Sequence, residues 1–97
     1  MARYILSPQA QASLKEIRAY TLKQFGKQQT VVYLKKLRNQ MKDLAITPAM
    51  GTERPEIKVG YYCSFVGSHT IYYRLSDTHI DIIDVLHQSM EPMRHLT

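Results

Sequence analysis

The most constraining feature of the sequence is a pair of apolar runs, residues 70–75 and 80–86, separated by the polar segment Ser76-Asp77-Thr78. The first run is rich in β-branched and aromatic residues, which favour strands, and the second is apolar on both faces, which is typical of a central strand. Ser, Asp and Thr favour reversals of the chain. The two runs therefore predict a hairpin within a sheet, and the fold has to bury it.

Two helical patterns precede this hairpin. Residues 3–6 predict a short strand that ends at Ser7-Pro8, where serine is a good N-cap and proline fits the first helical turn. Two apolar stripes at three- and four-residue spacing follow, and Gly26 between them is typical of a helix end, so the pattern predicts an antiparallel helix hairpin. The stripes comprise Ala10, Leu14, Ile17, Tyr20, Thr21 and Phe25, then Val31, Leu34, Leu37, Met41, Leu44 and Ala45.

The second half of the chain predicts the sheet. Residues 47–52 contain Pro48 and Gly51 and indicate a loop. Residues 54–59 predict an edge strand or an extended approach to one, and Gly60 predicts a bend after it. Residues 61–66 predict a strand, and Gly67-Ser68 predicts a hairpin turn. Residues 89–97 predict a helical turn near Pro92. The predicted fold is α+β: an N-terminal strand, an antiparallel helix hairpin, then a three- to four-stranded antiparallel sheet, in a single domain over residues 1–97.

Charge is divided unevenly along the chain, whose formal net charge is +5. Residues 1–46 carry a formal charge of +7 and residues 47–97 carry −2. The cationic helical half is suited to an acidic or phosphate-bearing partner. Alternatively, lysines on the outer faces of helices serve solubility alone.

Several classes of protein are disfavoured by what the sequence contains. Cys63 is the single cysteine, which excludes an internal disulfide, and its apolar strand predicts a buried thiol in a reducing, cytoplasmic setting. No apolar run has the length of a signal peptide or a membrane span. The histidines fall on separate predicted segments with no close pair, so we expect no metal and no cofactor. The four are His69, His79, His87 and His95.

A series of residues spread over nearly the whole chain resembles one known family. The series comprises Tyr4-x-Leu6-Ser7, Ala10, Leu14, Ile17, Tyr20, Phe25-Gly26, Tyr33, Leu37, Leu44-Ala45-x-x-Pro48-x-x-Gly51, Arg54, Gly67-x-His69, Tyr73-Arg74 and Val85-Leu86-His87-x-x-Met90. Its order and spacing are similar to those of the ParE toxins of bacterial type II toxin–antitoxin modules. Tyr61-Tyr62 depart from the pattern, since many relatives carry arginine there.

The resemblance implies the fold of the wider ParE and RelE superfamily, with the N-terminal strand joined to the C-terminal ones. It also implies a toxin that stabilises the cleaved complex of DNA gyrase with DNA, is neutralised by a ParD-like antitoxin and needs no catalytic residue. We expect no sequence-specific nucleic-acid binding by the toxin alone. The candidates for target contact are Arg54, Lys58, Arg74, His87, Met90 and Arg94, and those for antitoxin contact are Arg18, Lys35, Arg38 and Lys42.

Two alternative functions stay open at this point. RelE-like relatives cleave mRNA on the ribosome, which requires a base, an acid and cations for the phosphate. His87, Glu56, Arg74 and Lys58 are candidates, but residues 61–71 contain no Lys or Arg. The other alternative is a non-toxic module that only binds its antitoxin. For His87 a structural role, capping its strand and bonding a backbone carbonyl, competes with a contact role. Of the tyrosines, the sequence predicts Tyr4, Tyr20, Tyr33 and Tyr73 in the core and leaves Tyr61, Tyr62 and Tyr72 undecided.

Overall fold

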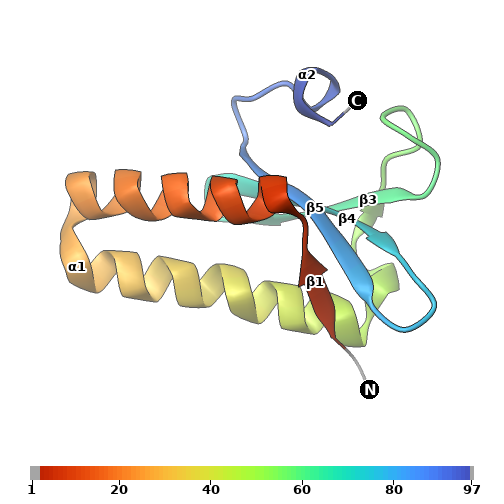
Figure 1. The fold of residues 1–97 in the computed structure, drawn as a ribbon, viewed down its shortest axis with the longest axis horizontal. Coiled ribbons are helices and arrows are strands. Elements are labelled where there is room, and N and C mark those ends of the chain that lie inside the picture. Colours follow the sequence, from red (N-terminus) through yellow and green to blue (C-terminus); the bar gives the residue numbers. More distant parts are fainter. Residues whose placement is uncertain (1–2, 97) are drawn as a thin grey trace.

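A long helix and a five-stranded sheet dominate the structure, a computed structural model that describes residues 3–96 (Figure 1). The sheet order is β1-β5-β4-β3-β2, and the fold is α+β as expected. The elements are β1 (Tyr4–Leu6), α1 (Pro8–Ile46), the 3-10 helix η1 (Pro48–Met50), β2 (Thr52–Glu53), β3 (Tyr61–Val66), β4 (His69–Leu75), β5 (Ile80–His87) and α2 (Pro92–His95).

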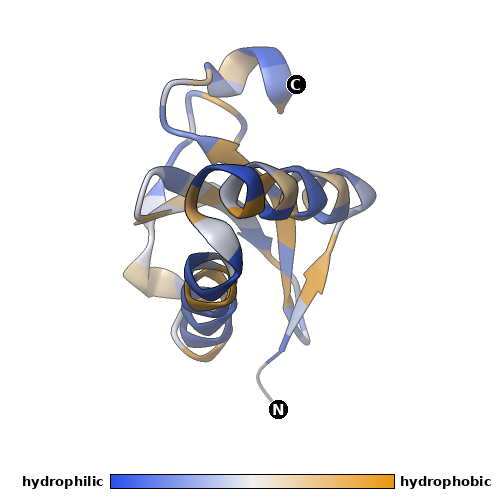
Figure 2. Cartoon of the chain, turned by 90° about the vertical axis from the view of Figure 1, so that its left-hand side faces the viewer, coloured by the Kyte–Doolittle hydropathy of each residue, from blue (hydrophilic) through white to orange (hydrophobic). Residues whose placement is uncertain are grey.

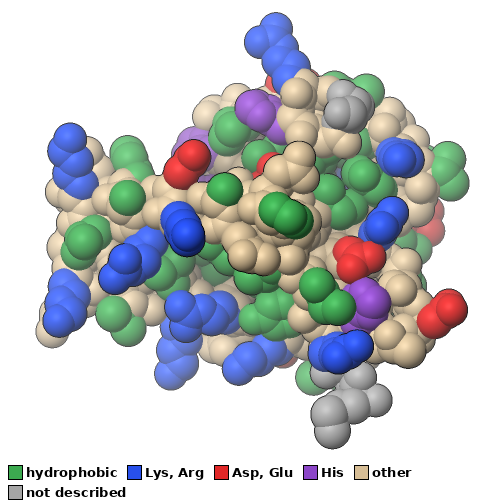
Figure 3. Space-filling model, in the orientation of Figure 1, with side chains coloured by type: hydrophobic (Ala, Val, Ile, Leu, Met, Phe, Trp, Pro, Cys, Tyr) green, Lys and Arg blue, Asp and Glu red, His purple; other side chains and the backbone are tan. Residues whose placement is uncertain are grey.

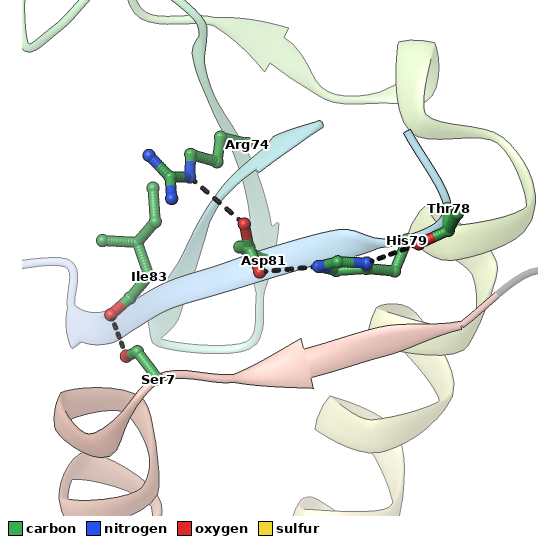
Figure 4. Close-up of polar contacts among 6 residues, drawn as sticks. All are labelled: Ser7, Arg74, Thr78, His79, Asp81 and Ile83. Atoms are coloured by element: carbon green, nitrogen blue, oxygen red, sulfur yellow. Dashed lines mark hydrogen bonds and ion pairs between the residues drawn. The ribbon is translucent and has the colours of Figure 1, made fainter. Parts of the chain in front are cut away.

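The sheet is mixed, so the prediction of a purely antiparallel sheet is wrong at one edge. Strand β1 runs parallel to β5, with Tyr4 opposite Ile80 and Leu6 opposite Ile82, while the other strand pairs are antiparallel. Nearly the whole chain separates β1 from β5, so no tight turn dictates their relative direction. At the end of β1, the Ser7 hydroxyl donates to the carbonyl of Ile83 at 2.6 Å (Figure 4).

Helix α1 consists of two arms, residues 8–25 and 27–46, that lie side by side (Figure 1). Ser7 caps its start by accepting from the Ala10 N–H at 3.0 Å. The backbone leaves the helical conformation at Gly26, where φ is +86°, a region that favours glycine. Figure 2 views the arms nearly end-on and shows hydrophilic and hydrophobic residues alternating around each of them.

Two apolar clusters hold these elements together, one on each face of the sheet. The cluster between α1 and the sheet includes Leu37, Met41 and Tyr73, all fully buried. The cluster on the outer face includes Cys63 and is partly covered by Leu96 from the C-terminal segment. Cys63 is buried, as its strand position predicted.

Three members of the predicted apolar stripes are not in the core. Tyr20, Phe25 and Val31 have exposed fractions of 63%, 64% and 60%. They flank Gly26, at the end of the arms that extends beyond the sheet (Figure 1). Helical spacing identifies one face of a helix but not where its partner layer ends, so the prediction of a core position is wrong for these residues.

The prediction of an edge strand, or of an extended approach to one, over residues 54–59 is also wrong. Strand β2 ends at Glu53, and the Ile57 and Lys58 N–H groups donate to the carbonyl of Arg54 at 3.1 and 3.4 Å. Pro55 cannot supply the N–H that a ladder needs, and Gly60 adopts a φ of +92°. The segment therefore forms a turn that leads into β3.

Candidate functional site

Two grooves flank the first arm of α1. The groove on the side of the sheet encloses about 630 Å³ and is predominantly apolar. We refer to it as the apolar groove. It is lined by Ser13, Glu16, Ile17, Tyr20, Thr21, Phe25, Gln29, Tyr33, Ser68, His69, Val85, Leu86, His87 and Met90. The exposed aromatic rings of Tyr20 and Phe25 therefore form its rim instead of joining the core.

Tyr33 connects the second arm to the turn between β3 and β4 at one end of this groove. Its hydroxyl lies 3.2 Å from the Val66 carbonyl and 2.5 Å from Nδ1 of His69, and it accepts from the Ser68 N–H at 3.3 Å. A Cβ at Gly67 would lie 2.7 Å from the Tyr33 ring, so glycine is required for this close approach. The Tyr33 hydroxyl thus adds polar contacts to the core packing that holds the second arm on the sheet.

His69 and His87 form a pair in the apolar groove, contrary to the expectation that no two histidines lie close. They are opposite each other in the β4–β5 register, and their ring centroids are 5.4 Å apart at an interplanar angle of 88°. Burial, and then the neighbouring His87, lower the pKa of His69 below its usual value of 6.5. His69 is therefore neutral at pH 7, and the groove gains no charge from it.

His87 is exposed, and its hydrogen bonds differ from those predicted for a residue that caps its strand. Nδ1 of His87 accepts from the Ser89 N–H at 3.1 Å and lies 2.7 Å from the Ser89 hydroxyl, so its backbone partner is an N–H and not a carbonyl. No cluster of three or more metal-ligating side chains occurs within residues 3–96.

The second groove lies on the other side of the first arm and encloses about 450 Å³. We refer to it as the cationic groove. It is lined by Arg18, Leu22, Lys27, Thr30, Val31, Leu34, Lys35, Arg38, Asn39 and Lys42, with no acidic residue. All four candidates for antitoxin contact thus lie in one groove. Figure 3 shows Lys and Arg side chains gathered over α1.

Lys27 also lines this groove although it was not among the predicted candidates, and the sequence contains a usable signal for it. Lys27, Val31 and Lys35 recur at four-residue spacing, which places them on one face of the second arm. Their face carries Arg38 and Lys42 as well, at offsets of three and seven residues from Lys35. Charge counted over the whole segment conceals this alignment.

The outer face of the sheet carries a polar chain of side chains (Figure 4). Nε of Arg74 donates to Asp81 at 3.2 Å, and Nε2 of His79 lies 2.9 Å from the other oxygen of the same carboxylate. Nδ1 of His79 is 3.0 Å from the Thr78 hydroxyl. Asp81 therefore orients Arg74, whose side chain remains 56% exposed.

Arg54 supports the turn before β3. Its Nε donates to Glu56 at 2.6 Å, and Nη1 lies 3.6 Å from Sγ of the buried Cys63. The hydrogen bond with Glu56 is the main cause that raises the pKa of Arg54, and the same bond lowers the pKa of the Glu56 carboxyl. Arg54 is thus tied to its own loop, and a carboxylate with a lowered pKa is a poor general base at neutral pH.

The structure divides the candidates for target contact between two places. Arg54 and Arg74 lie on the outer face of the sheet, Lys58 follows in the adjoining turn, and Arg94 lies in α2. His87 and Met90 instead line the apolar groove.

Comparison with solved structures identifies the class of fold. The chain superposes on a chain of the chromosomal ParDE toxin–antitoxin system from P. aeruginosa with a TM-score of 0.77 at 18% identity, covering 90% of this chain and 96% of that one. It also resembles a chain of the toxin–antitoxin complex RelBE2 from Mycobacterium tuberculosis, with a TM-score of 0.58 at 21% identity, covering 89% and 96%. The fold is that of chains in toxin–antitoxin systems.

Sequence comparison identifies the family. Residues 4–92 match the family described as the ParE toxin of the type II toxin–antitoxin system parDE. The chain is 41% identical to Toxin ParE1 of Mycobacterium tuberculosis, covering 98% of each, and 35% identical to Toxin ParE1 of Caulobacter vibrioides, covering 99% of each. The chain therefore belongs to the ParE toxin family, as the residue pattern predicted. Within residues 3–96, no helix combines the length and hydropathy needed to cross a bilayer.

Proposed function

We propose that this ParE-family protein poisons DNA gyrase by binding to it, with no chemistry of its own. The observation that carries the proposal is the family match over residues 4–92. The resemblance to ParE toxins implies a protein that holds gyrase on cleaved DNA, so that replication ends in double-strand breaks. The place of action is then the cytoplasm.

The arrangement of charged groups supports binding over RNA cleavage. A ribonuclease site needs cations fixed in advance around the scissile phosphate. Residues 61–71, which span β3 and the first three residues of β4, contain no Lys or Arg. The Glu56 carboxylate is hydrogen-bonded to Arg54, and Arg74 is hydrogen-bonded to Asp81. The candidate base and one candidate phosphate ligand thus already have partners within the protein.

We propose the outer face of the sheet and the C-terminal segment as the surface that contacts gyrase. Lys58, Arg74 and Arg94 are exposed there, and Asp81 orients Arg74 toward a defined position. His87 and Met90 would contribute only if the target also reaches into the apolar groove. Arg54 has a structural role in this surface, because it holds the turn before β3.

We also propose that a ParD-like antitoxin neutralises the protein through Arg18, Lys35, Arg38 and Lys42. The four cations line one groove, which supports a single acidic partner segment. In this arrangement the antitoxin surface on α1 and the gyrase surface on the outer sheet face are separate.

The decisive experiment adds the purified protein to DNA gyrase and supercoiled plasmid. We expect linear plasmid to accumulate with the protein and to decrease when the cognate antitoxin is added first. A parallel reaction with translating ribosomes tests the RelE-like alternative, and cut mRNA there with intact plasmid in the first assay would refute the proposal. A protein inert in both assays, and harmless on induction, would be the non-toxic antitoxin-binding module.

Alanine substitutions locate the gyrase surface. We expect Lys58→Ala, Arg74→Ala and Arg94→Ala together to reduce plasmid cleavage at least about tenfold, since contact cations each contribute a fraction of a kcal/mol to about 1 kcal/mol. Lys15→Ala and Lys36→Ala are the matched control, because both lysines are exposed and lie outside both grooves. Equal loss in the two variants would refute this location of the surface.

A further inference from the structure

His69 and His87 lie on the face of the sheet that packs against α1. His69 is two residues before the core residue Ile71 in β4, and His87 is two residues after the core residue Val85 in β5. Side chains two residues apart in a strand point to the same face of the sheet. Both imidazoles therefore point toward α1, and both line the apolar groove.

The hydrogen bonds of the β4–β5 ladder make this a close pair. The Gln88 N–H donates to the Ser68 carbonyl at 2.9 Å, so Ser68 and Gln88 form a hydrogen-bonded pair. The two kinds of pair alternate along antiparallel strands, so His69 and His87 form a non-hydrogen-bonded pair, in which the Cα atoms are only about 4.5 Å apart. Side chains approach each other most closely in pairs of this kind.

The separation of the two rings fits one metal ion between them. A ring nitrogen lies about 2.0 to 2.1 Å from zinc, which places the ring centroid about 3.2 Å from the ion. Two imidazoles on one tetrahedral ion then have their centroids about 5.2 Å apart. The centroids of His69 and His87 are 5.4 Å apart, and their interplanar angle of 88° is compatible because each ring can turn about its own metal–nitrogen bond.

The hydrogen bonds of His69 leave its Nε2 available as a ligand. The Tyr33 hydroxyl donates to the Val66 carbonyl and accepts from the Ser68 N–H. With the hydroxyl proton on that carbonyl, Nδ1 of His69, 2.5 Å from the hydroxyl oxygen, carries a proton and donates it. The lone pair of the neutral ring is then on Nε2, and metal-binding histidines are commonly oriented by such a bond from their other nitrogen.

His87 has a partner that can serve the same purpose. Its Nδ1 lies 2.7 Å from the Ser89 hydroxyl and accepts from the Ser89 N–H. When a metal occupies Nε2, the ring proton moves to Nδ1, which donates to the hydroxyl, and the N–H of the exposed Ser89 turns to water. Within residues 3–96, no hydrogen bond engages Nε2 of either histidine.

The charge around the pair favours a cation, although the formal net charge of the chain is +5. Among residues 3–96, no Lys or Arg lines the apolar groove, and Glu16 is the one carboxylate that does. A divalent ion in this groove therefore meets no lysine or arginine at close range, and one carboxylate attracts it.

We propose that His69 and His87 bind a divalent transition-metal ion such as Zn²⁺ through their Nε2 atoms, with water completing a tetrahedral shell. The ion joins β4 to β5 beside the contact that Tyr33 makes with the sheet. At a free metal concentration 100 times the Kd, it lowers the unfolding equilibrium constant about 100-fold. The inference is independent of gyrase and of the antitoxin.

The test titrates Zn²⁺ into the full-length protein, without an affinity tag and freed of metal by a chelator that is then removed. Isothermal titration calorimetry should give a single ion per chain. NMR of the imidazole nitrogens identifies the ligands: we expect Nε2 of His69 and of His87 to shift on addition of Zn²⁺, and the nitrogens of His79 and His95 to stay unchanged.

The chain supplies a matched pair of histidine variants. His87→Ala removes an exposed ligand, and we expect at least about 100-fold weaker binding, because losing only the hydrogen-bond partner of a ligand costs about 10- to 100-fold. His95→Ala removes an exposed histidine outside the groove and should leave the affinity within about threefold. Ser89→Ala should weaken binding about tenfold. His69→Ala should match His87→Ala, with circular dichroism to check that it is folded.

Three results would overturn the inference. One is the absence of saturable binding below about 1 mM Zn²⁺. Another is an equal loss of affinity in His87→Ala and His95→Ala, which would indicate scattered surface binding. The third is a shift of imidazole nitrogens at His79 instead of His87, which would place the ion beside Asp81 on the outer face. Failure of the gyrase assay leaves the metal result unaffected, and a gyrase poison that binds no Zn²⁺ refutes this inference alone.

Discussion

The two grooves share the first arm of α1 yet differ in what their residues do for the fold. Ile17, in the apolar groove, is also part of the core, and Tyr33 at the same groove joins α1 to the sheet. Leu22, in the cationic groove, is half exposed and belongs to neither apolar cluster. One groove is thus a continuation of the core, and the other is a surface added to the outside of the arms.

This difference predicts that substitutions in the apolar groove act through stability and those in the cationic groove act through binding. A partner that uses the apolar groove meets side chains fixed by the fold. A partner that uses the cationic groove meets long, solvated side chains, whose charges set the rate of association more than the final affinity.

The largest expected effect is that of Ile17→Ala. Truncating this buried side chain removes apolar contacts and leaves a cavity, so we expect the free energy of unfolding to fall by about 2 to 3 kcal/mol. Leu22→Ala on the other side of the arm should cost about 1 kcal/mol or less. Urea unfolding followed by circular dichroism measures both. If the two variants lose similar free energy of unfolding, the apolar groove is no more a part of the core than the cationic groove.

The next effect concerns the hydroxyl that joins the second arm to the sheet. Tyr33→Phe leaves the Ser68 N–H and the Val66 carbonyl without this partner, and we expect it to lower the free energy of unfolding by about 1 to 2 kcal/mol. Tyr20→Phe is the control in the same groove, because that ring is 63% exposed. If both variants unfold at the same urea concentration, the Tyr33 hydroxyl does not fix the arm.

The sequence predicted the local elements well because their signals are local. Ser7-Pro8 marks the start of α1, Gly26 marks the break in it, and Gly67 (φ +56°) marks the turn between β3 and β4. The family, too, was recognisable, since its residues occur at fixed spacing. Each of these signals depends on a few consecutive or regularly spaced residues.

Most of the errors share one cause, namely that they depend on distant parts of the chain; the strand predicted over residues 54–59 is an exception, because Pro55 and Gly60 are local signals against it. The direction of β1 is decided by β5, and the exposure of Tyr20 and Phe25 by how far the sheet extends under the arms. The contact of His69 with His87 follows from a register across β4 and β5. The four antitoxin candidates were found by charge, but the groove they share, and the apolar residues that line it with them, required the arrangement of both arms.

A pH dependence should distinguish the apolar groove from the cationic one. The folded protein holds the pKa of His69 below 6.5, so between the folded and unfolded pKa values the unfolded chain binds more protons. The contribution of His69 to stability is therefore fully present above about pH 6.5 and is lost as the pH falls through the folded pKa.

The measurement compares urea unfolding of the wild type and His69→Gln at about pH 7.5 and about pH 5.5. We expect the wild type to lose more stability on acidification than the variant. Lys35→Gln, in the cationic groove, should keep the wild-type pH dependence, because lysine does not titrate in this range. Identical pH dependence in His69→Gln and the wild type would show that burial of His69 does not influence folding.

The smallest effect has the opposite sign and belongs to the cationic groove. Arg38 lies three residues after Lys35 and four before Lys42, and like charges at these spacings repel along a helix. Arg38→Gln should therefore raise the free energy of unfolding by about 0.5 kcal/mol in low salt, and the gain should disappear in about 0.5 M salt.

Lys36→Gln is the control, because its neighbours at three and four residues are uncharged: Val32, Tyr33, Asn39 and Gln40. If Arg38→Gln stabilises the protein while weakening its binding to the antitoxin, the groove's charges oppose folding and favour binding. Cations that destabilise their own helix are better explained by binding to a partner than by solubility. Lysines spaced too far apart to repel one another would serve solubility equally well. A destabilised Arg38→Gln would instead indicate that the arginine packs as part of the fold, and the contrast between the grooves would then lie in charge alone.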